Sequence, residues 1–194
     1  MNEEQSIKKT ILDVTLKFLR QGNIDKISIR KIAKEAGVAI GNINYHFQTK
    51  DNLIKMAVNI LVKEEIDTRT IPEDIEKMQP VDILRHYVKA TAGFLVKNPL
   101  IAKNSILNDL IHGGETTNSE QTATAYLPLL EKVFNRNNPK EHYILLEQLL
   151  GTLQVIFLRS NQLQKYSGLD IYNDAQRDEL IDQLIDNLVG KGTV

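Results

Sequence analysis

The sequence predicts an all-α protein of about nine helices, with a small N-terminal three-helix unit followed by a larger helical domain. Apolar residues recur along nearly the whole chain at the spacing that places them on one face of a helix, and no segment alternates as a strand would. Gly, Pro and Asn stand at most of the points where one pattern stops and the next begins. We place the domain boundary between residues 48 and 49, which gives domains 1–48 and 49–194.

Composition narrows the possible functions. A hydrophobic content of 42% over 194 residues is ample for a core. The absence of cysteine excludes disulfides, thiolate metal sites and a cysteine nucleophile. Residues 1–50 hold nine Lys or Arg against five Asp or Glu, so the N-terminal part is basic although the net charge of the chain is −1. A charge difference of this size also arises by chance, and it is compatible with an anionic partner at the N-terminal part.

The beginning of the chain does not resemble an export signal. Acidic residues stand where a signal peptide would be basic, and lysines interrupt the apolar positions. No apolar stretch approaches the roughly 20 residues that span a bilayer. We therefore expect a cytoplasmic protein that does not contact a membrane.

The first helix is predicted from Ile7 to about residue 21, where Gly22 and Asn23 close the pattern. Its role is to bury the backs of the next two helices, and Ile24, Ile27 and Ile32 complete the small core.

The segment 28–53 organises the rest of the chain. Ser28 can cap a helix that runs to Gly37, a second short helix follows at once, and Thr49 caps a third. The second helix carries the apolar pattern Val38, Ile40, Ile43 and Phe47. Two helices joined by so tight a turn form a helix-turn-helix, whose second helix enters the major groove of DNA.

These residues resemble a known family. The run IAKEAGV at 32–38, the glycine at position 41, Tyr45-His46-Phe47, Lys50 and Leu53 are similar to the DNA-binding signature of the tetracycline-repressor (TetR) family of bacterial transcriptional regulators. The resemblance is detailed over about residues 7–60 and beyond them extends to length and helical character. It implies the following DNA-binding set: Ser28, Arg30, Asn42, Asn44, Tyr45, His46 and Lys50.

The resemblance also implies different roles within this set. Ser28, Tyr45, His46 and Lys50 match positions that chiefly hold phosphates, with the alternative that Tyr45 packs against the first helix. From their side-chain chemistry, Arg30, Asn42 and Asn44 can reach base edges. The chain departs from the family at the start of the second helix. Ala39 replaces the usual Ser or Thr cap, Ile40 replaces a frequent Lys or Arg, and Asn44 replaces an aromatic residue.

The larger domain reads as further helices. We predict helices from Thr49 towards Pro72, from Pro80 to Asn98, and over residues 100–111, 120–134, 140–164 and 173–188. Pro128 predicts a kink or a late start in the helix that contains it. The segment 112–120 reads as a loop, in which Gly113 and Gly114 are either a moving part or a plain turn.

The last two predicted helices carry more apolar surface than one core needs. We expect them to form a homodimer through a four-helix bundle, with the alternative that both faces enter the chain's own core. The predicted interface residues are Leu146, Leu150, Leu153, Phe157, Leu184 and Leu188.

No catalytic, metal or cofactor motif occurs. The four histidines lack zinc-ligand spacing, and the chain has no phosphate-binding glycine loop, dinucleotide fingerprint or nucleophile elbow. We therefore expect no enzyme activity and no cofactor. TetR-like proteins generally bind a small molecule, and the residues suited to orient one are His86, Asn104, Asn108, His112, Tyr126 and Gln154. Without a cluster of Arg or Lys in these helices, we expect a hydrophobic or amphipathic effector.

The sequence thus predicts a homodimeric repressor that binds a palindromic operator in double-stranded DNA until an effector shifts the dimer geometry. Two alternatives stay open. One is a TetR-like DNA-binding protein without a small-molecule effector, and the other is a helical enzyme or small-molecule carrier on the same fold. The retained backbone-contacting residues argue against the second.

Overall fold

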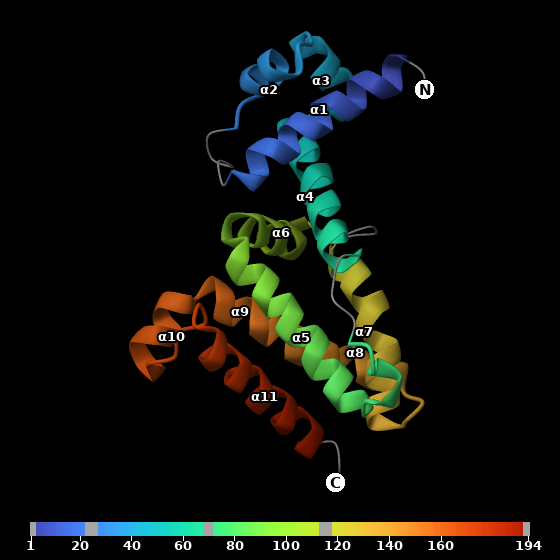
Figure 1. The fold of residues 1–194 in the computed structure, drawn as a ribbon, viewed down its shortest axis with the longest axis vertical. Coiled ribbons are helices and arrows are strands. Elements are labelled where there is room, and N and C mark those ends of the chain that lie inside the picture. Colours follow the sequence, from blue (N-terminus) through green and yellow to red (C-terminus); the bar gives the residue numbers. More distant parts are fainter. Residues whose placement is uncertain (1–2, 22–26, 68–71, 113–117, 192–194) are drawn as a thin grey trace. The chain divides into compact units, whose positions relative to one another are not determined.

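The computed structural model describes residues 3–21, 27–67, 72–112 and 118–191, and these residues form helices and turns without a strand. Contacts divide the chain into two units, Met1–Thr68 and Arg69–Val194. Figure 1 shows the helices of both. The helix that follows Thr49 groups with the first unit, whereas the sequence places it in the larger domain; the functional division after residue 48 stays a prediction. None of the described helices combines the length and apolar character needed to cross a membrane.

The first unit consists of α1 (Glu3–Arg20), α2 (Ile29–Ala36), α3 (Ile40–Phe47) and α4 (Lys50–Asp67). Helix α1 contacts each of the other three, as the sequence predicts for its role. The buried side chains come from all four helices and include Ile11, Leu19, Ile27, Ile32, Ile43, Phe47 and Leu53. Gly22, Asn23 and Ile24 lie outside the described residues.

Two ion pairs join α1 to its neighbours. Lys17 Nζ lies 2.7 Å from Glu35 Oε1 of α2, and a guanidinium nitrogen of Arg20 lies 2.6 Å from a carboxylate oxygen of Glu64 in α4. All four side chains are about half exposed. Because exposed pairs contribute little, typically about 0 to 1 kcal/mol, the apolar core holds this unit together.

The second unit begins with a 3₁₀ turn, η2 (Ile75–Lys77). Helices α5 (Pro80–Lys97), α6 (Pro99–His112) and α7 (Asn118–Phe134) follow. Proline starts α5, as predicted, because the missing N–H would have no partner at that position. Helix α7 continues through Pro128, so the late start that the sequence allowed does not occur. Gly113 and Gly114 lie outside the described residues.

The next segment is one long helix with a wide turn in it. It comprises α8 (Pro139–Leu146), the π-helical turn η3 (Glu147–Gly151) and α9 (Thr152–Leu158). Leu146, Glu147, Gly151 and Thr152 all have right-handed helical backbone angles, so the axis is not interrupted there. The helix ends at Arg159 (φ −114°, ψ 28°), and α10 (Ser160–Ser167) is a separate element. The single helix predicted over 140–164 is therefore wrong at its C-terminal end.

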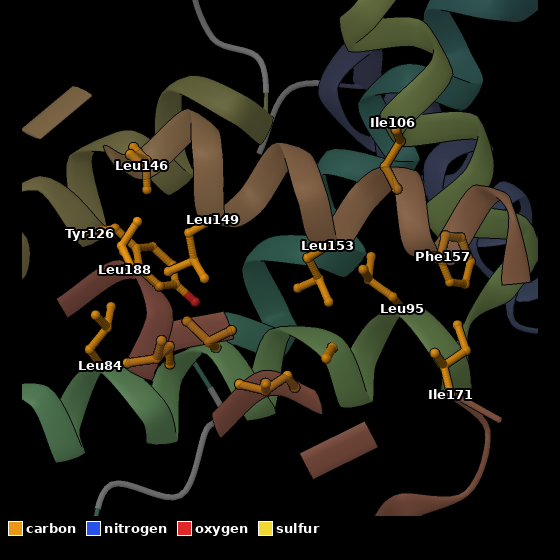
Figure 2. Packing of buried hydrophobic residues seen from close by; sticks show 14 of the residues in the cluster. Leu84, Leu95, Ile106, Tyr126, Leu146, Leu149, Leu153, Phe157, Ile171 and Leu188 are labelled. Atoms are coloured by element: carbon orange, nitrogen blue, oxygen red, sulfur yellow. The ribbon is translucent and has the colours of Figure 1, made fainter. Parts of the chain in front are cut away.

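The last helix, α11 (Asp174–Lys191), completes the unit, in which α5 contacts α6, α7, α9 and α11. Figure 2 shows Leu149 and Leu153 pointing from the long helix towards α5. Arg85 and Lys89 of α5 also pair with the carboxylate of Asp182 in α11, at 3.2 and 2.8 Å. Partial burial acts to raise the pKa of Asp182, but the hydrogen bonds from Lys89 and Arg85 outweigh it, so this pKa lies below its usual value.

Candidate nucleic-acid interface

Helix α2 is capped at both ends by residues next to it in the sequence. Ser28 has extended backbone angles, and its Oγ accepts the N–H of Lys31 at 3.2 Å. At the other end Gly37 adopts φ 66°, which glycine reaches without steric cost. The N–H groups of Gly37 and Val38 bond back to the carbonyls of Lys34 and Ala33. This pair of bonds is a Schellman motif, and it turns the chain sharply into α3.

Helix α3 lacks the caps that α2 has. Ala39 occupies its cap position with extended backbone and provides no side-chain hydrogen bond, as the sequence predicts. The helix ends at Gln48, whose φ of 64° and ψ of −54°, together with a bond of 2.7 Å from the Thr49 N–H to the Phe47 carbonyl, form a γ-turn of the rarer, positive-φ kind. Such a conformation is strained in a residue other than glycine. Buried Ile43 and Phe47 hold the helix in place.

The outer face of α3 consists of Ile40, Gly41, Asn44 and Tyr45, all exposed. Ile40, which the sequence counts in the apolar pattern of this helix, has 43% of its surface exposed. The buried residues of α3 are Ile43 and Phe47, so Ile40 belongs to the apolar pattern without being buried. A Cβ atom added at Gly41 would meet nothing within 4 Å, so the fold of the chain does not require glycine there.

The predicted DNA-binding residues all belong to the first unit, on the N-cap of α2, on α2 and α3, and at the start of α4. Ser28, Arg30, Asn44 and Tyr45 are exposed, and Asn42, His46 and Lys50 are half-buried. The ring of His46 lies edge-on between those of Tyr45 and Phe47, with centroids 5.1 and 6.1 Å away. The structure thus brings the set together on one small unit, and its contact with DNA stays a prediction.

The first turns of α1 also reach α3, in line with the predicted role of this helix. Lys8 Nζ lies 5.9 Å from the centroid of the Phe47 ring. The carboxylate of Glu4 raises the pKa of Tyr45, because it favours the neutral phenol as a hydrogen-bond donor and because ionisation would place a second negative charge beside the first. These residues are far apart in the sequence, and no spacing rule connects them.

The predicted dimer residues lie mostly inside the second unit. Leu146, Leu153, Phe157 and Leu188 are buried in the core of the chain itself, and Leu150 and Leu184 are half-buried. Figure 2 shows this core, with the four buried residues labelled. The apolar residues most exposed on the long helix are instead Tyr143, Ile144 and Val155.

The predicted ligand-binding residues have different surroundings, and their role stays a prediction. The hydroxyl of Tyr126, a buried residue, bonds the carbonyl of Tyr87 at 2.9 Å and the hydroxyl of Thr91 at 2.7 Å. Asn104 is exposed and donates to the carbonyl of Leu100 in its own helix. His86, Asn108 and Gln154 are half-buried, and the side chain of His112 lies outside the described residues.

Two hollows of the second unit are lined by other residues. One, between α5, α9 and α11, has a volume of about 10 Å³, enough for about one water molecule, and is lined by apolar side chains and Arg177. The other is a groove of about 500 Å³ between η2, α5 and α7. Its lining includes Ile75, Met78, Ile83, Tyr87 and Leu129, with Glu76 and Lys132 also present.

A family model described as bacterial regulatory proteins of the tetR family matches residues 11–57, which include α2 and α3. The chain is 31% identical over 67 residues to the HTH-type transcriptional regulator PksA of Bacillus subtilis and 28% identical over 96 residues to the HTH-type transcriptional repressor KstR of Mycolicibacterium smegmatis. These matches cover 34% and 50% of this chain. The chain spans only 32% and 47% of the lengths of those two relatives.

Solved structures match over nearly the whole chain. A protein of Mesorhizobium loti described as a TetR-family transcriptional regulator aligns with a TM-score of 0.54 at 13% identity, covering 98% of both chains. A transcriptional regulator of Pseudomonas aeruginosa PAO1 aligns with a TM-score of 0.55 at 18% identity, covering 98% of this chain and 93% of its own. At such identities the likeness concerns the fold. The tetR-family match of the sequence covers residues 11–57, and the fold of the chain resembles that of the solved regulators.

Proposed function

We propose that the chain is a transcriptional regulator that binds double-stranded operator DNA through α2 and α3. The observation that carries this proposal is the division of α3 into two faces. Ile43 and Phe47 are buried and anchor it to the unit, while Ile40, Asn44 and Tyr45 are exposed on its other face. A short helix that presents polar and apolar groups outward, after a tight turn, suits the major groove.

The predicted DNA-binding residues would make two kinds of contact, with phosphates and with base edges. Ser28, Tyr45, His46 and Lys50 would hold phosphates, and Arg30, Asn42 and Asn44 would reach base edges. Ser28 already accepts a backbone hydrogen bond, but its hydroxyl hydrogen can still be donated to a phosphate. We add Ile40 to the base-reading set, since an exposed aliphatic group can contact the methyl group of thymine.

Binding by fluorescence anisotropy across a salt series tests these roles, with an operator first obtained by selection from random duplexes. Lys50→Ala should weaken binding to every sequence and lower the salt slope by about one unit per protomer. Lys63→Ala is the matched control, because this exposed lysine lies 13 residues further along α4, about 20 Å from Lys50. Asn44→Ala should relax the preference at one base position by about 1 to 3 kcal/mol. Unchanged preference would remove Asn44 from the base readers.

We further propose that the chain acts as a homodimer through the long helix and α11. Since Leu146, Leu153, Phe157 and Leu188 are committed to the core, the contact would use Ile144 and Val155 with the half-buried Leu150 and Leu184. Val155→Asp should then convert a dimer into a monomer of 22.0 kDa in light scattering and weaken operator binding. Tyr166→Asp, at a more exposed residue of α10, should leave the dimer intact. A wild-type monomer at micromolar concentration would contradict the proposal.

Regulation by a small effector is proposed for the groove between η2, α5 and α7. Its volume of about 500 Å³ suits a small molecule, and its mainly apolar lining suits a hydrophobic or amphipathic one. An effector can release DNA only if it favours a conformation with lower DNA affinity. In a thermal-shift screen, Ala125→Leu in the groove should abolish the shift caused by a hit. Thr124→Leu, next to it in α7 and outside the lining, should preserve the shift; equal shifts in both variants would place the effector elsewhere.

A further inference from the structure

Lys8 of α1 lies over the ring of Phe47, the buried residue that ends α3. Its Nζ is 5.9 Å from the ring centroid, which is within the range of a cation–π contact. Lys8 is half-buried, and a lysine of this kind keeps its methylene stem on apolar surface and its ammonium group at the edge that faces water. Helix α1, which lies beside α3 in Figure 1, thereby places a positive charge at the C-terminal end of α3.

The charge of Lys8 is not neutralised by an acidic side chain of the unit. Two other bases of α1, Lys17 and Arg20, pair with carboxylates of α2 and α4 at 2.7 and 2.6 Å. Among the side chains that the structure describes, Lys8 has no ion-pair partner, and Glu4, one helical turn before it, is not paired with it. The contact with the Phe47 ring positions the ammonium group of Lys8 and leaves its charge available to an anion outside the protein.

This charge stands next to the residues that are predicted to hold phosphates. Tyr45 and His46 directly precede Phe47, and Lys50 follows it by three residues. The His46 ring and the Lys8 ammonium group each lie about 6 Å from the Phe47 ring, at 6.1 and 5.9 Å from its centroid. A DNA strand held by His46 would pass close to this ammonium group. A lysine that is already packed against a ring also loses less side-chain freedom when it binds a phosphate.

We propose that Lys8 binds a DNA phosphate and extends the DNA-binding surface from α2, α3 and the start of α4 onto α1. The proposal rests on the proposed DNA-binding function. Because a lysine at a phosphate carries no base information, Lys8 contributes to affinity for every sequence and not to the choice between sequences. Phe47 then has two roles, since it anchors α3 in the core and its ring positions the charge of Lys8.

Three substitutions of Lys8 separate its charge from its packing. Lys8→Met removes the charge and keeps an apolar stem over the ring, Lys8→Gln removes the charge and keeps a polar end, and Lys8→Arg keeps the charge. Binding to a labelled mixed-sequence duplex of about 30 bp is measured by anisotropy between about 50 and 200 mM salt. Lys8→Met and Lys8→Gln should each lower affinity about threefold to tenfold and lower the salt slope by about one unit per protomer. Lys8→Arg should keep the wild-type slope and bind within about twofold of the wild type.

Lys9→Met is the matched control, because it removes the same charge from the next residue, which is exposed and lies about 100° further round α1. It should change affinity and slope less than Lys8→Met does. Equal losses in the two variants would overturn the proposal, since they would show a general effect of positive charge on α1.

Thermal melting separates a phosphate contact from a purely structural role. If Lys8 served only to pack α1 against Phe47, Lys8→Met or Lys8→Gln would lower the thermal midpoint and leave the salt slope unchanged, and this result would also overturn the proposal. Lys50→Ala, measured beside them, shows whether the DNA-binding function itself holds. A lower slope in Lys50→Ala with a wild-type slope in Lys8→Met removes Lys8 alone, whereas a wild type without salt-dependent binding to any duplex removes the proposed DNA-binding function.

Discussion

The two helices of the helix-turn-helix have the same length but are held in different ways. Helix α2 is capped at both ends, by Ser28 at its start and by the Schellman motif of Gly37 at its end. Helix α3 begins at an uncapped Ala39 and ends at Gln48 in a strained turn. What keeps α3 helical is the burial of Ile43 and Phe47. The helical conformation of α3, the helix proposed to enter the major groove, therefore depends on its packing into the core. That of α2 is specified by its own capping residues.

The strongest way to break this comparison is to remove the anchor of α3. Phe47→Ala should cost about 3 to 5 kcal/mol of unfolding free energy, comparable to the whole stability of so small a unit. Amide exchange should show protection in α3 lost to a greater extent than in α2. Ile40→Ala, on the outer face of the same helix, should change stability by about 0.5 kcal/mol or less. Full protection of α3 in Phe47→Ala would show that packing does not hold it.

Two glycine substitutions, one after α2 and one in α3, should differ in their effect on the free energy of unfolding. Gly37→Ala forces a residue with a Cβ into φ 66° and should cost about 1 to 2 kcal/mol, although no atom lies within 4 Å of the new methyl. Gly41→Ala places alanine inside a helix and, also meeting nothing within 4 Å, should not lower stability. Chemical denaturation measures both. If Gly41→Ala keeps the fold and loses DNA affinity, its missing side chain serves close approach to DNA.

Exchanging the caps should make the two helices more alike. Ser28→Ala removes the acceptor of the Lys31 N–H and should cost about 1 kcal/mol, whereas Ala39→Ser supplies an acceptor that α3 lacks and should add up to about 1 kcal/mol. The thermal midpoint should fall in the first variant and rise in the second, with DNA affinity retained in the second. A lowered midpoint in Ala39→Ser would indicate that the alanine methyl packs against the unit.

The smallest expected effect concerns pH. The hydrogen bond and charge of Lys17 lower the pKa of Glu35, so the contribution of this pair to α2 is present at neutral pH and is lost as pH falls through that lowered pKa, below the usual 4.5. The Glu4 carboxylate raises the pKa of Tyr45 in α3, so the interaction that favours the neutral phenol is present at neutral pH and is lost as pH rises through that raised pKa, above the usual 10.0. Chemical shifts of α2 and α3 should therefore change at opposite ends of a titration. Lys17→Met should remove the acid change in α2 alone.

The sequence predicts much of this because caps and turns obey local rules. Ser28, Gly37, Thr49 and Pro80 stand at the helix boundaries where their chemistry places them, and the missing cap at Ala39 is equally readable. The family resemblance over this region is carried by the same kind of local signal.

The sequence could not show which apolar residues of a helix are buried in the chain's own core, because this depends on which face of the helix packs against its neighbours. Ile40 fits the apolar spacing of α3 and yet is exposed, while four leucine and phenylalanine residues assigned to a partner surface fill the chain's own core. The contact of Lys8 with Phe47 needs two helices to meet, which no local pattern reveals. The sequence also does not show that the side chain of Asn104 hydrogen-bonds a carbonyl of its own helix, or that residues other than the predicted ligand-binding ones line the two hollows of the second unit.

The π-helical turn at Glu147–Gly151 is a position where the chain can lose one residue and keep the helix packed as before. Deleting one residue from an ordinary α-helix rotates everything beyond it by about 100° and would turn a buried face outward. A π-helical turn already holds one residue more than an α-helical turn. Removing Gly151 would close it into regular helix, with Leu146 and Leu149 before it and Leu153 after it still facing α5. The middle of this helix is thus a place where a one-residue deletion conserves the register.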